Sequence, residues 1–299
     1  MVKKFNYGGQ AVIEGVMMRG QAAMVTAVRR SDGGMAMDTQ LLPAMANSRM
    51  RKTPFIRGVI ALIEAMVLGV KSLLYSANVS IEEEKEEKLS GRAVGGIVAG
   101  SVAFAFAVFF MGPLFLTRLI DDYIESSIVF HLVEGLVRLG IFVAYLKLLT
   151  LSTSLRRIFA YHGAEHKAVN AYEAGVPLEV GAVREYSTAH TRCGTSFLFV
   201  VLIIAIIVFA LIGRPSLWLM VLSRVILIPV IASLGYEITQ FGARHIESRL
   251  VRAFLAPGLW LQRLTTREPD DSQLEVALSA LRKAVEIDQL EEAGPAASG

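Results

Sequence analysis

Residues 93–117 read AVGGIVAGSVAFAFAVFFMGPLFLT, a run of 25 residues without a charged side chain. A helix of this length can cross the hydrocarbon core of a membrane, which is about 30 Å thick. Three further apolar segments follow, at about 127–149, 195–213 and 217–236. We therefore expect a mainly α-helical, polytopic membrane protein with about four transmembrane helices.

The composition agrees with this class. Hydrophobic residues make up 54% and charged residues 19% of the 299 residues, which is more apolar than a typical soluble domain. The net charge of +3 is too small to indicate a nucleic-acid-binding protein, so the partner we expect is the lipid bilayer. One cysteine, Cys193, excludes an intrachain disulfide, and the first twenty residues do not resemble a signal peptide. The oligomeric state stays open, a homo-oligomer included.

The segments on either side of the spans differ in character. Residues 1–54 are predicted to be a β-rich segment with a hairpin, whose strands run from Met24 to Arg30 and from Met35 to Leu41. Residues 55–92 are predicted to form an amphipathic helix and a charged linker. The membrane domain then covers 93–236 and includes a motif helix region at 154–194. Residues 237–299 form a C-terminal segment with an amphipathic helix near 272–287.

The helix predicted at 55–79 is expected to lie in the membrane interface. Thr53 is its expected N-cap and Pro54 its first residue. Arg57, Glu64 and Lys71 lie seven residues apart and form one polar stripe on an otherwise apolar cylinder. A helix with such a stripe suits the interface, or packing against the bundle, better than it suits a plain span.

The basic residues predict the orientation of the chain. Residues 1–57 contain nine Lys and Arg against three acids, whereas the two loops on the opposite side contain one arginine each, Arg118 and Arg214. Because cytoplasmic loops carry the excess of basic residues, we expect a multi-pass cell-membrane protein with both termini and the motif helix in the cytoplasm.

The motif helix contains the strongest chemical signal, in the stretch YHGAEHKAVNAYE at 161–173. Residues four apart lie on one face of a helix, so His162 and His166 can bind one metal ion. Glu165 precedes the second histidine, as in the H-x-x-E-H motif, where it would act as a general base. The alternative without a metal is a helix whose histidines only form hydrogen bonds with neighbouring groups.

Further ligands are expected from two other polar clusters that follow or precede a span on the same side of the membrane. The candidates for a third ligand are, in this order, His190, Cys193, Glu237 and His245. Glu173, and His245 if it is no ligand, are candidates for orienting the ligands from the second layer. Zinc is the expected metal, although imidazole ligands also suit iron, nickel and copper. Cys193 has two competing interpretations, as a small buried residue and as a nucleophile activated by its neighbours.

Four separated segments resemble one known family. They read GGQAVIEGVMMRG at 8–20, HGAEHKAVNAYE at 162–173, HTRCGTSF at 190–197 and PGLWLQRLTTREPDDSQLEVAL at 257–278. They are similar to the YqhQ-like family of bacterial membrane proteins of unknown function, which are described as predicted metal-dependent enzymes. The resemblance implies a metal site at His162, Glu165 and His166, and it implies no particular substrate or reaction.

Three functions compete at this point. The first is an integral-membrane metallohydrolase, with a peptidase as one form, and the second is a non-catalytic membrane scaffold with a structural metal or a hydrogen-bonded polar site. The third is a transporter in which the charges within the spans, Glu134, Arg138 and Arg224, line the pathway. An enzyme requires an open metal position with Glu165 beside it, whereas a scaffold requires a closed site or none.

Overall fold

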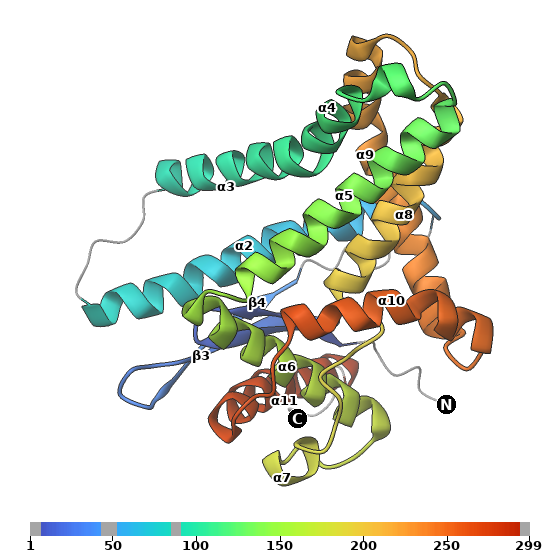
Figure 1. Cartoon of the computed structure of the whole chain (residues 1–299). Coiled ribbons are helices and arrows are strands. Elements are labelled where there is room, and N and C mark those ends of the chain that lie inside the picture. The colour runs from blue at the N-terminus through green and yellow to red at the C-terminus, as the bar shows by residue number, and fades with distance from the viewer. Residues whose placement is uncertain (1–6, 43–52, 85–90, 294–299) are drawn as a thin grey trace.

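The computed structural model describes residues 7–42, 53–84 and 91–293. Within these ranges the chain is mainly helical and has one small antiparallel sheet near the N-terminus, which confirms the predicted fold class (Figure 1). Parts of the predicted 1–54 and 55–92 segments, at 1–6, 43–52 and 85–90, lie outside the described residues, as does 294–299.

The sheet contains four strands in the order β1 (Gly8–Val12), β2 (Gly15–Arg19), β3 (Ala23–Arg29) and β4 (Met35–Leu41). β3 and β4 are the predicted hairpin, within one residue of the expected ends, and Arg29 lies opposite Met35. β1 and β2 form a second hairpin from the glycine-rich segment, which the sequence did not assign to strands. Its two-residue turn is Ile13–Glu14, and Glu14 takes a left-handed φ of 52°.

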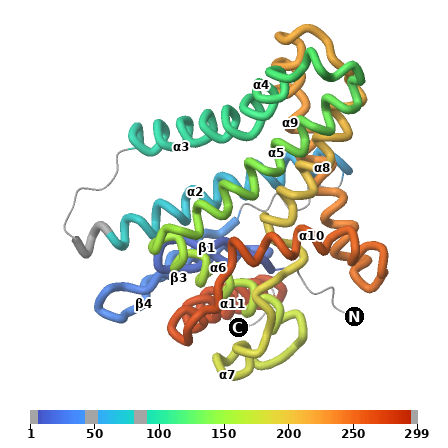
Figure 2. The backbone as a smooth tube through the Cα atoms, viewed as in Figure 1, coloured from blue at the N-terminus to red at the C-terminus, as the bar shows by residue number. Residues whose placement is uncertain are grey.

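Helices cover both faces of this sheet, as Figure 2 shows. α6 (Thr153–Ala174) and α11 (Asp271–Ala293) pack on one face, and α2 (Ile56–Glu84) packs on the other. The alternation of side chains along each strand sends neighbouring residues to opposite faces. The core under α6 and α11 joins segments far apart in sequence: Val16, Met18, Val25, Tyr161, Ala164, Ala168, Leu274, Leu278 and Leu281.

The described helices include five that are long and apolar enough to cross a membrane. One is α2, and one is a continuous segment of α3 (Gly91–Phe106), the π-helical η2 (Ala107–Met111) and α4 (Gly112–Arg118). The others are α5 (Ser127–Leu149), α8 (Gly194–Ile212) and α9 (Leu217–Arg244). A short 3-10 helix, η3 (Asp121–Tyr123), lies between α4 and α5.

Several predicted helix boundaries were wrong, among them the ends of α2, at Glu84 rather than 79, and of α11, at Ala293 rather than 287. α2 begins at Ile56 rather than at Pro54, because Phe55 has a left-handed φ of 67° that interrupts the helix. α9 continues eight residues beyond the predicted end at 236, because no glycine-and-proline stop follows Tyr236. A further helix, α10 (Arg249–Thr265), was not predicted at all, although Pro257 lies inside it.

Two charges of the predicted stripe on α2 form ion pairs within the protein. Arg57 Nε donates to Glu237 Oε1 of α9 at 2.7 Å, and Glu64 accepts from Arg19 of β2 at 2.9 Å. Lys71 is exposed. The stripe therefore faces protein over the first half of α2, as expected for a helix that packs against the bundle.

The packing also bears on whether α2 crosses the membrane. Two predicted spans, α3–α4 and α5, lie between α2 and α6 in the chain. If both of these spans cross the membrane, α6 lies on the same side of the membrane as the end of α2. The sheet precedes α2 in the chain and shares a core with α6, so we expect the start of α2 on that side too. A single helix whose two ends lie on one side does not cross, which supports the interfacial prediction although length and composition would suit a span.

We predict that both halves of α2 react from the cytoplasm only. Cysteines introduced as Thr53→Cys and Lys71→Cys are both at exposed positions, and the native Cys193 is only 5% exposed, so its background is low. A membrane-impermeant maleimide added to intact cells should label neither variant, and permeabilised cells should show both labelled. Labelling of either cysteine from outside would require α2 to span the bilayer.

The centre of the bundle contains four buried polar side chains. Glu134 of α5 accepts hydrogen bonds from Arg138 at 2.5 Å and from Arg224 of α9 at 2.7 Å, and its other neighbour is His131 at 3.0 Å. All four residues are 2% exposed or less. Charges inside a membrane domain are tolerated when they are paired in this way, so the cluster links α5 to α9.

Candidate metal centre

The helix that carries the motif has clear ends. Ser152 caps it by accepting a hydrogen bond from the Leu155 amide at 3.4 Å, and Gly175 ends it in the left-handed conformation at φ 75°. The sequence leaves Ser152 and Ser154 open as the start of this helix and indicates a stop at Gly175 and Pro177, and the structure has Ser152 and Gly175. His162 and His166 therefore lie one turn apart on one face, with ring centroids 4.4 Å apart.

Gly163 within the motif allows a close approach that the sequence alone did not reveal. A Cβ at this position would lie 2.0 Å from the backbone carbonyl oxygen of Arg267, which is closer than atoms can approach. The segment after α10 therefore packs directly on α6, and only glycine leaves room for it. This contact brings the end of α10 to the histidines.

Each motif histidine is oriented by a backbone carbonyl. His162 Nδ1 lies 2.8 Å from the carbonyl oxygen of Thr265, and His166 Nδ1 lies 2.6 Å from that of Thr188. A carbonyl oxygen only accepts, so each Nδ1 carries a proton in this arrangement and each Nε2 is the ring atom left for another contact. This is the orientation that metal-binding histidines normally have.

Cys193 completes a group of three potential ligands. It is the N-cap residue of α8, and its Sγ lies 3.4 Å from His162 Nε2. One ligand atom from each of His162, His166 and Cys193 lies within 4.8 Å of the other two. Zn–N bonds of about 2.1 Å and Zn–S bonds of about 2.3 Å at a tetrahedral angle put nitrogen and sulfur roughly 3.6 Å apart. The His162–Cys193 separation fits this value.

Glu165 lies beside the three side chains. Its Oε2 is 3.4 Å from His166 Nε2, and the residue is only 4% exposed. On its other side it contacts β1, since a Cβ on Gly9 would lie 3.1 Å from Glu165 Cγ. The carboxylate therefore lies next to the proposed metal position, within a part of the protein that largely excludes water.

His190, Glu173 and Arg192 form an adjacent network. The His190 ring centroid lies 5.7 Å from that of His166, and His190 Nε2 is 3.5 Å from Glu173 Oε2. Burial raises the pKa of Glu173, but hydrogen bonds from His190 and Arg192 outweigh it and lower the pKa to about 2. Glu173 is therefore an anion at neutral pH that holds His190 next to the three potential ligands.

Glu237 and His245, the other two candidate ligands, have different partners. Glu237 lies within α9, where it accepts from Arg57 and from the Phe55 amide at 3.2 Å. His245 follows α9, and its Nδ1 lies 2.9 Å from the Phe241 carbonyl oxygen. The structure thus brings His162, His166 and Cys193 together, with Glu165 and His190 next to them, and engages Glu237 and His245 elsewhere.

Sequence reasoning missed the contribution of α10. Gln262 is fully buried, accepts from the His190 amide at 2.9 Å and donates to the His190 carbonyl at 2.8 Å, so it fixes the loop that carries Cys193. Thr265 supplies the carbonyl that orients His162. The sequence feature that could have indicated α10 is a helical repeat whose positions are buried in the structure: Leu255, Gly258, Leu261, Gln262 and Thr265.

Comparison with known proteins agrees with the resemblance of the four segments. The family described as "Protein of unknown function (DUF1385)" matches residues 53–287. The "Uncharacterized protein YqhQ" of Bacillus subtilis (strain 168) is 37% identical over 302 residues, which cover 96% of this chain and 94% of that protein. No solved structure matches the chain.

Proposed function

The chain belongs to the DUF1385 family, and we propose that it is a membrane-associated, metal-dependent hydrolase whose site is His162, His166 and Cys193 with Glu165 as general base. The observation that carries the proposal is the convergence of the three ligand atoms within 4.8 Å. The two carbonyls that orient the histidines support it, because they hold each Nδ1 and leave each Nε2 as the atom that can bind a metal.

The donor set suits a catalytic zinc ion. Two imidazoles and one thiolate leave the fourth tetrahedral position open for water or substrate, as in catalytic zinc sites with three protein ligands. The metal, when bound, would supply a Lewis acid that makes a water molecule acidic near neutral pH. Two imidazoles and a thiolate disfavour calcium and magnesium, which prefer oxygen ligands.

Glu165 has the chemistry that hydrolysis requires. Its carboxylate takes a proton from the water molecule, whose oxygen forms a bond to the carbonyl carbon of the substrate. The bond from that carbon to the leaving group then breaks, and Glu165 returns the proton to the leaving group. Atoms and charges balance with water as the only co-reactant. Esters and amides are the substrate classes that fit this sequence of steps, so a peptidase is one form of the proposal.

A structural metal site is the second candidate, and one distance favours it. Glu165 Oε2 lies 3.4 Å from His166 Nε2, which is close enough for a small movement to make the carboxylate a fourth ligand. Such a site would be closed, as in structural zinc sites, and would join α6 to the start of α8 without catalysing a reaction.

The proposal predicts about one zinc ion per chain in protein purified without chelators or a polyhistidine tag. Elemental analysis after zinc supplementation measures this directly. Substitution with cobalt(II) should add a thiolate-to-cobalt charge-transfer band in the near ultraviolet, and this band should vanish in Cys193→Ser. Wild-type protein with well under one metal per chain would refute the metal site, and an unchanged band in Cys193→Ser would exclude the thiolate as a ligand.

A further inference from the structure

The outer strand of the sheet, β1, has an open edge. It pairs with β2 only, and among the described residues no strand pairs with its other side. Val12 and Gly15 close a two-residue hairpin, so they form a hydrogen-bonded pair and the bonding alternates from there. Gln10 and Gly8 therefore bond to β2, whereas the N–H and C=O groups of Gly9 and Ala11 point to the open edge.

This edge passes the proposed metal centre. Gly9 is exposed, and its backbone lies against the side chain of Glu165, which in turn is next to His166. Any side chain at Gly9 would collide with β2, because its Cβ would be 2.2 Å from the Met17 carbonyl oxygen. Glycine is therefore required at the point where β1 passes Glu165.

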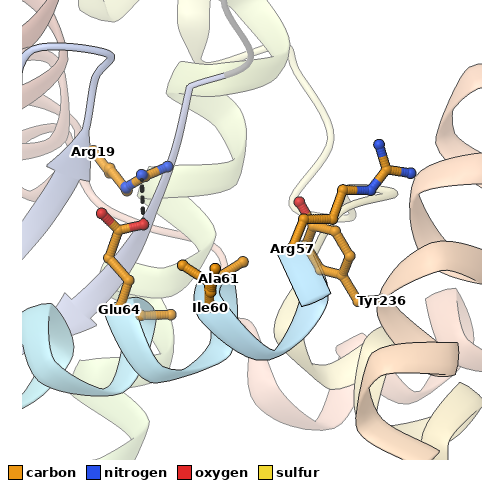
Figure 3. Close-up of a pocket in the computed structure, with 7 residues that line it drawn as sticks. Arg19, Arg57, Ile60, Ala61, Glu64 and Tyr236 are labelled. Atoms are coloured by element: carbon orange, nitrogen blue, oxygen red, sulfur yellow. Dashed lines mark hydrogen bonds and ion pairs between the residues drawn. The ribbon is translucent and has the colours of Figure 1, made fainter. Parts of the chain in front are cut away.

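Two adjoining cavities lead from the membrane domain to this edge. One, of about 190 Å³, lies between α2, β2 and α9, from Arg57 and Tyr236 at one end to Arg19 and Glu64 at the other (Figure 3). The second, of about 180 Å³, also has Arg19 in its wall and reaches Gly8 and Gly9. Together they form one groove along α2 that ends beside β1.

The lining of the groove indicates which chemistry it accepts. Each guanidinium has its own carboxylate, Arg19 with Glu64 and Arg57 with Glu237, so the lining has no surplus positive charge for an anionic headgroup. Apolar side chains, among them Ile60 and Leu68, line the rest.

We propose that β1 binds an extended polypeptide as a fifth strand of the sheet, with side chains of that polypeptide in the groove along α2. Main-chain groups at an open edge recognise the main chain of a peptide in any sequence, and a neutral, mostly apolar groove accepts its side chains. For the reaction, this inference rests on the proposed function. Strand pairing would identify polypeptides as the substrate class and would place a peptide bond of the bound chain beside Glu165. Binding itself is independent of the metal.

Hydrogen exchange with a defined probe tests this inference. The full-length Glu165→Gln chain, which should bind without turnover, is measured in detergent with and without dephosphorylated casein, an unfolded polypeptide without phosphate groups. Exchange in residues 8–12 should slow with casein, whereas exchange in β4, the opposite edge, should not change. Phosphatidylglycerol in the micelles should leave residues 8–12 unaffected. Protection by the lipid and not by casein would overturn the inference, as would equal protection of both edges.

A pair of substitutions at one position isolates the main-chain contact. Ala11→Pro removes the outward N–H, which is tolerated on an edge strand, while Ala11→Val enlarges the side chain and keeps the N–H. One lost hydrogen bond should weaken casein binding by about 2- to 10-fold in the proline variant only. Equal binding by both variants would refute strand pairing. If casein protects β1 in a chain that binds no metal, the hydrolase is refuted and the strand pairing stands. If the chain binds metal but casein does not protect β1, the strand pairing is refuted and the hydrolase stands.

Discussion

His166→Ala is expected to purify with almost no metal, whereas Glu165→Gln is expected to keep close to one ion per chain. Removal of His166 leaves two protein ligands, and its Nδ1 contact to the Thr188 carbonyl is lost as well. A glutamine at 165 keeps the size of the side chain and removes only its charge and its ability to accept a proton. Metal content of the two purified variants, measured beside the wild type, checks this result.

The structure offers a matched control for this comparison. His245→Ala also removes an imidazole, but His245 contacts Phe241 and is not part of the three-ligand group. Its metal content should equal that of the wild type. If Glu165→Gln loses metal as completely as His166→Ala, then Glu165 is a fourth ligand, the site is closed and the scaffold replaces the hydrolase. If all three variants keep the metal, the ion is bound elsewhere.

The motif helix was predictable because its signals are local. Ser152 and Gly175 mark its two ends, and the spacing of His162 and His166 follows from helical geometry alone. The same holds for the β3–β4 hairpin and for the long apolar helices, whose composition decides their type. These predictions needed no knowledge of which elements meet in space.

The third member of the candidate ligand group was not predictable, because it depends on packing between distant segments. The sequence placed Glu237 near the motif on the assumption that the fourth span ended at 236, but α9 continues and keeps Glu237 beside Arg57. Cys193 reaches His162 because Gln262 of α10 fixes the preceding loop. No local pattern relates position 262 to position 193, so only the fold could distinguish Cys193 from the other candidates.

The strands β1 and β2 were also not predictable from the sequence. Residues 8–20 were not assigned to strands because of the glycines at 8, 9 and 15, since glycine is disfavoured within strands. In the structure Gly9 and Gly15 are required by close backbone contacts, with a Cβ at either position 2.2 Å from a carbonyl oxygen of the neighbouring strand. Strand glycines with this role mark a close approach of backbones, and this reason becomes visible only once the strands are paired.

Glu134→Gln is expected to have the largest effect on stability of any substitution in the membrane bundle. The change leaves Arg138 and Arg224, each 1% exposed, without the carboxylate that both contact. Their remaining partners are backbone carbonyls and aromatic rings, among them Phe209. Breaking a buried ion pair by removal of one partner typically costs about 3–5 kcal/mol, so we expect a protein that unfolds at a much lower temperature.

Two further variants serve as controls for Glu134→Gln. Glu286→Gln breaks an exposed pair with Lys283, and it should change the free energy of unfolding by less than about 1 kcal/mol.

The triple variant Glu134→Gln, Arg138→Met and Arg224→Met removes both unpaired charges while position 134 can still form a hydrogen bond with His131. Apolar replacement of a buried charged triad is often neutral or stabilising, so thermal unfolding in detergent should return close to that of the wild type. A stable triple variant that keeps its metal and its β1 contacts would assign the cluster to stability. A single variant as stable as the wild type would contradict this prediction.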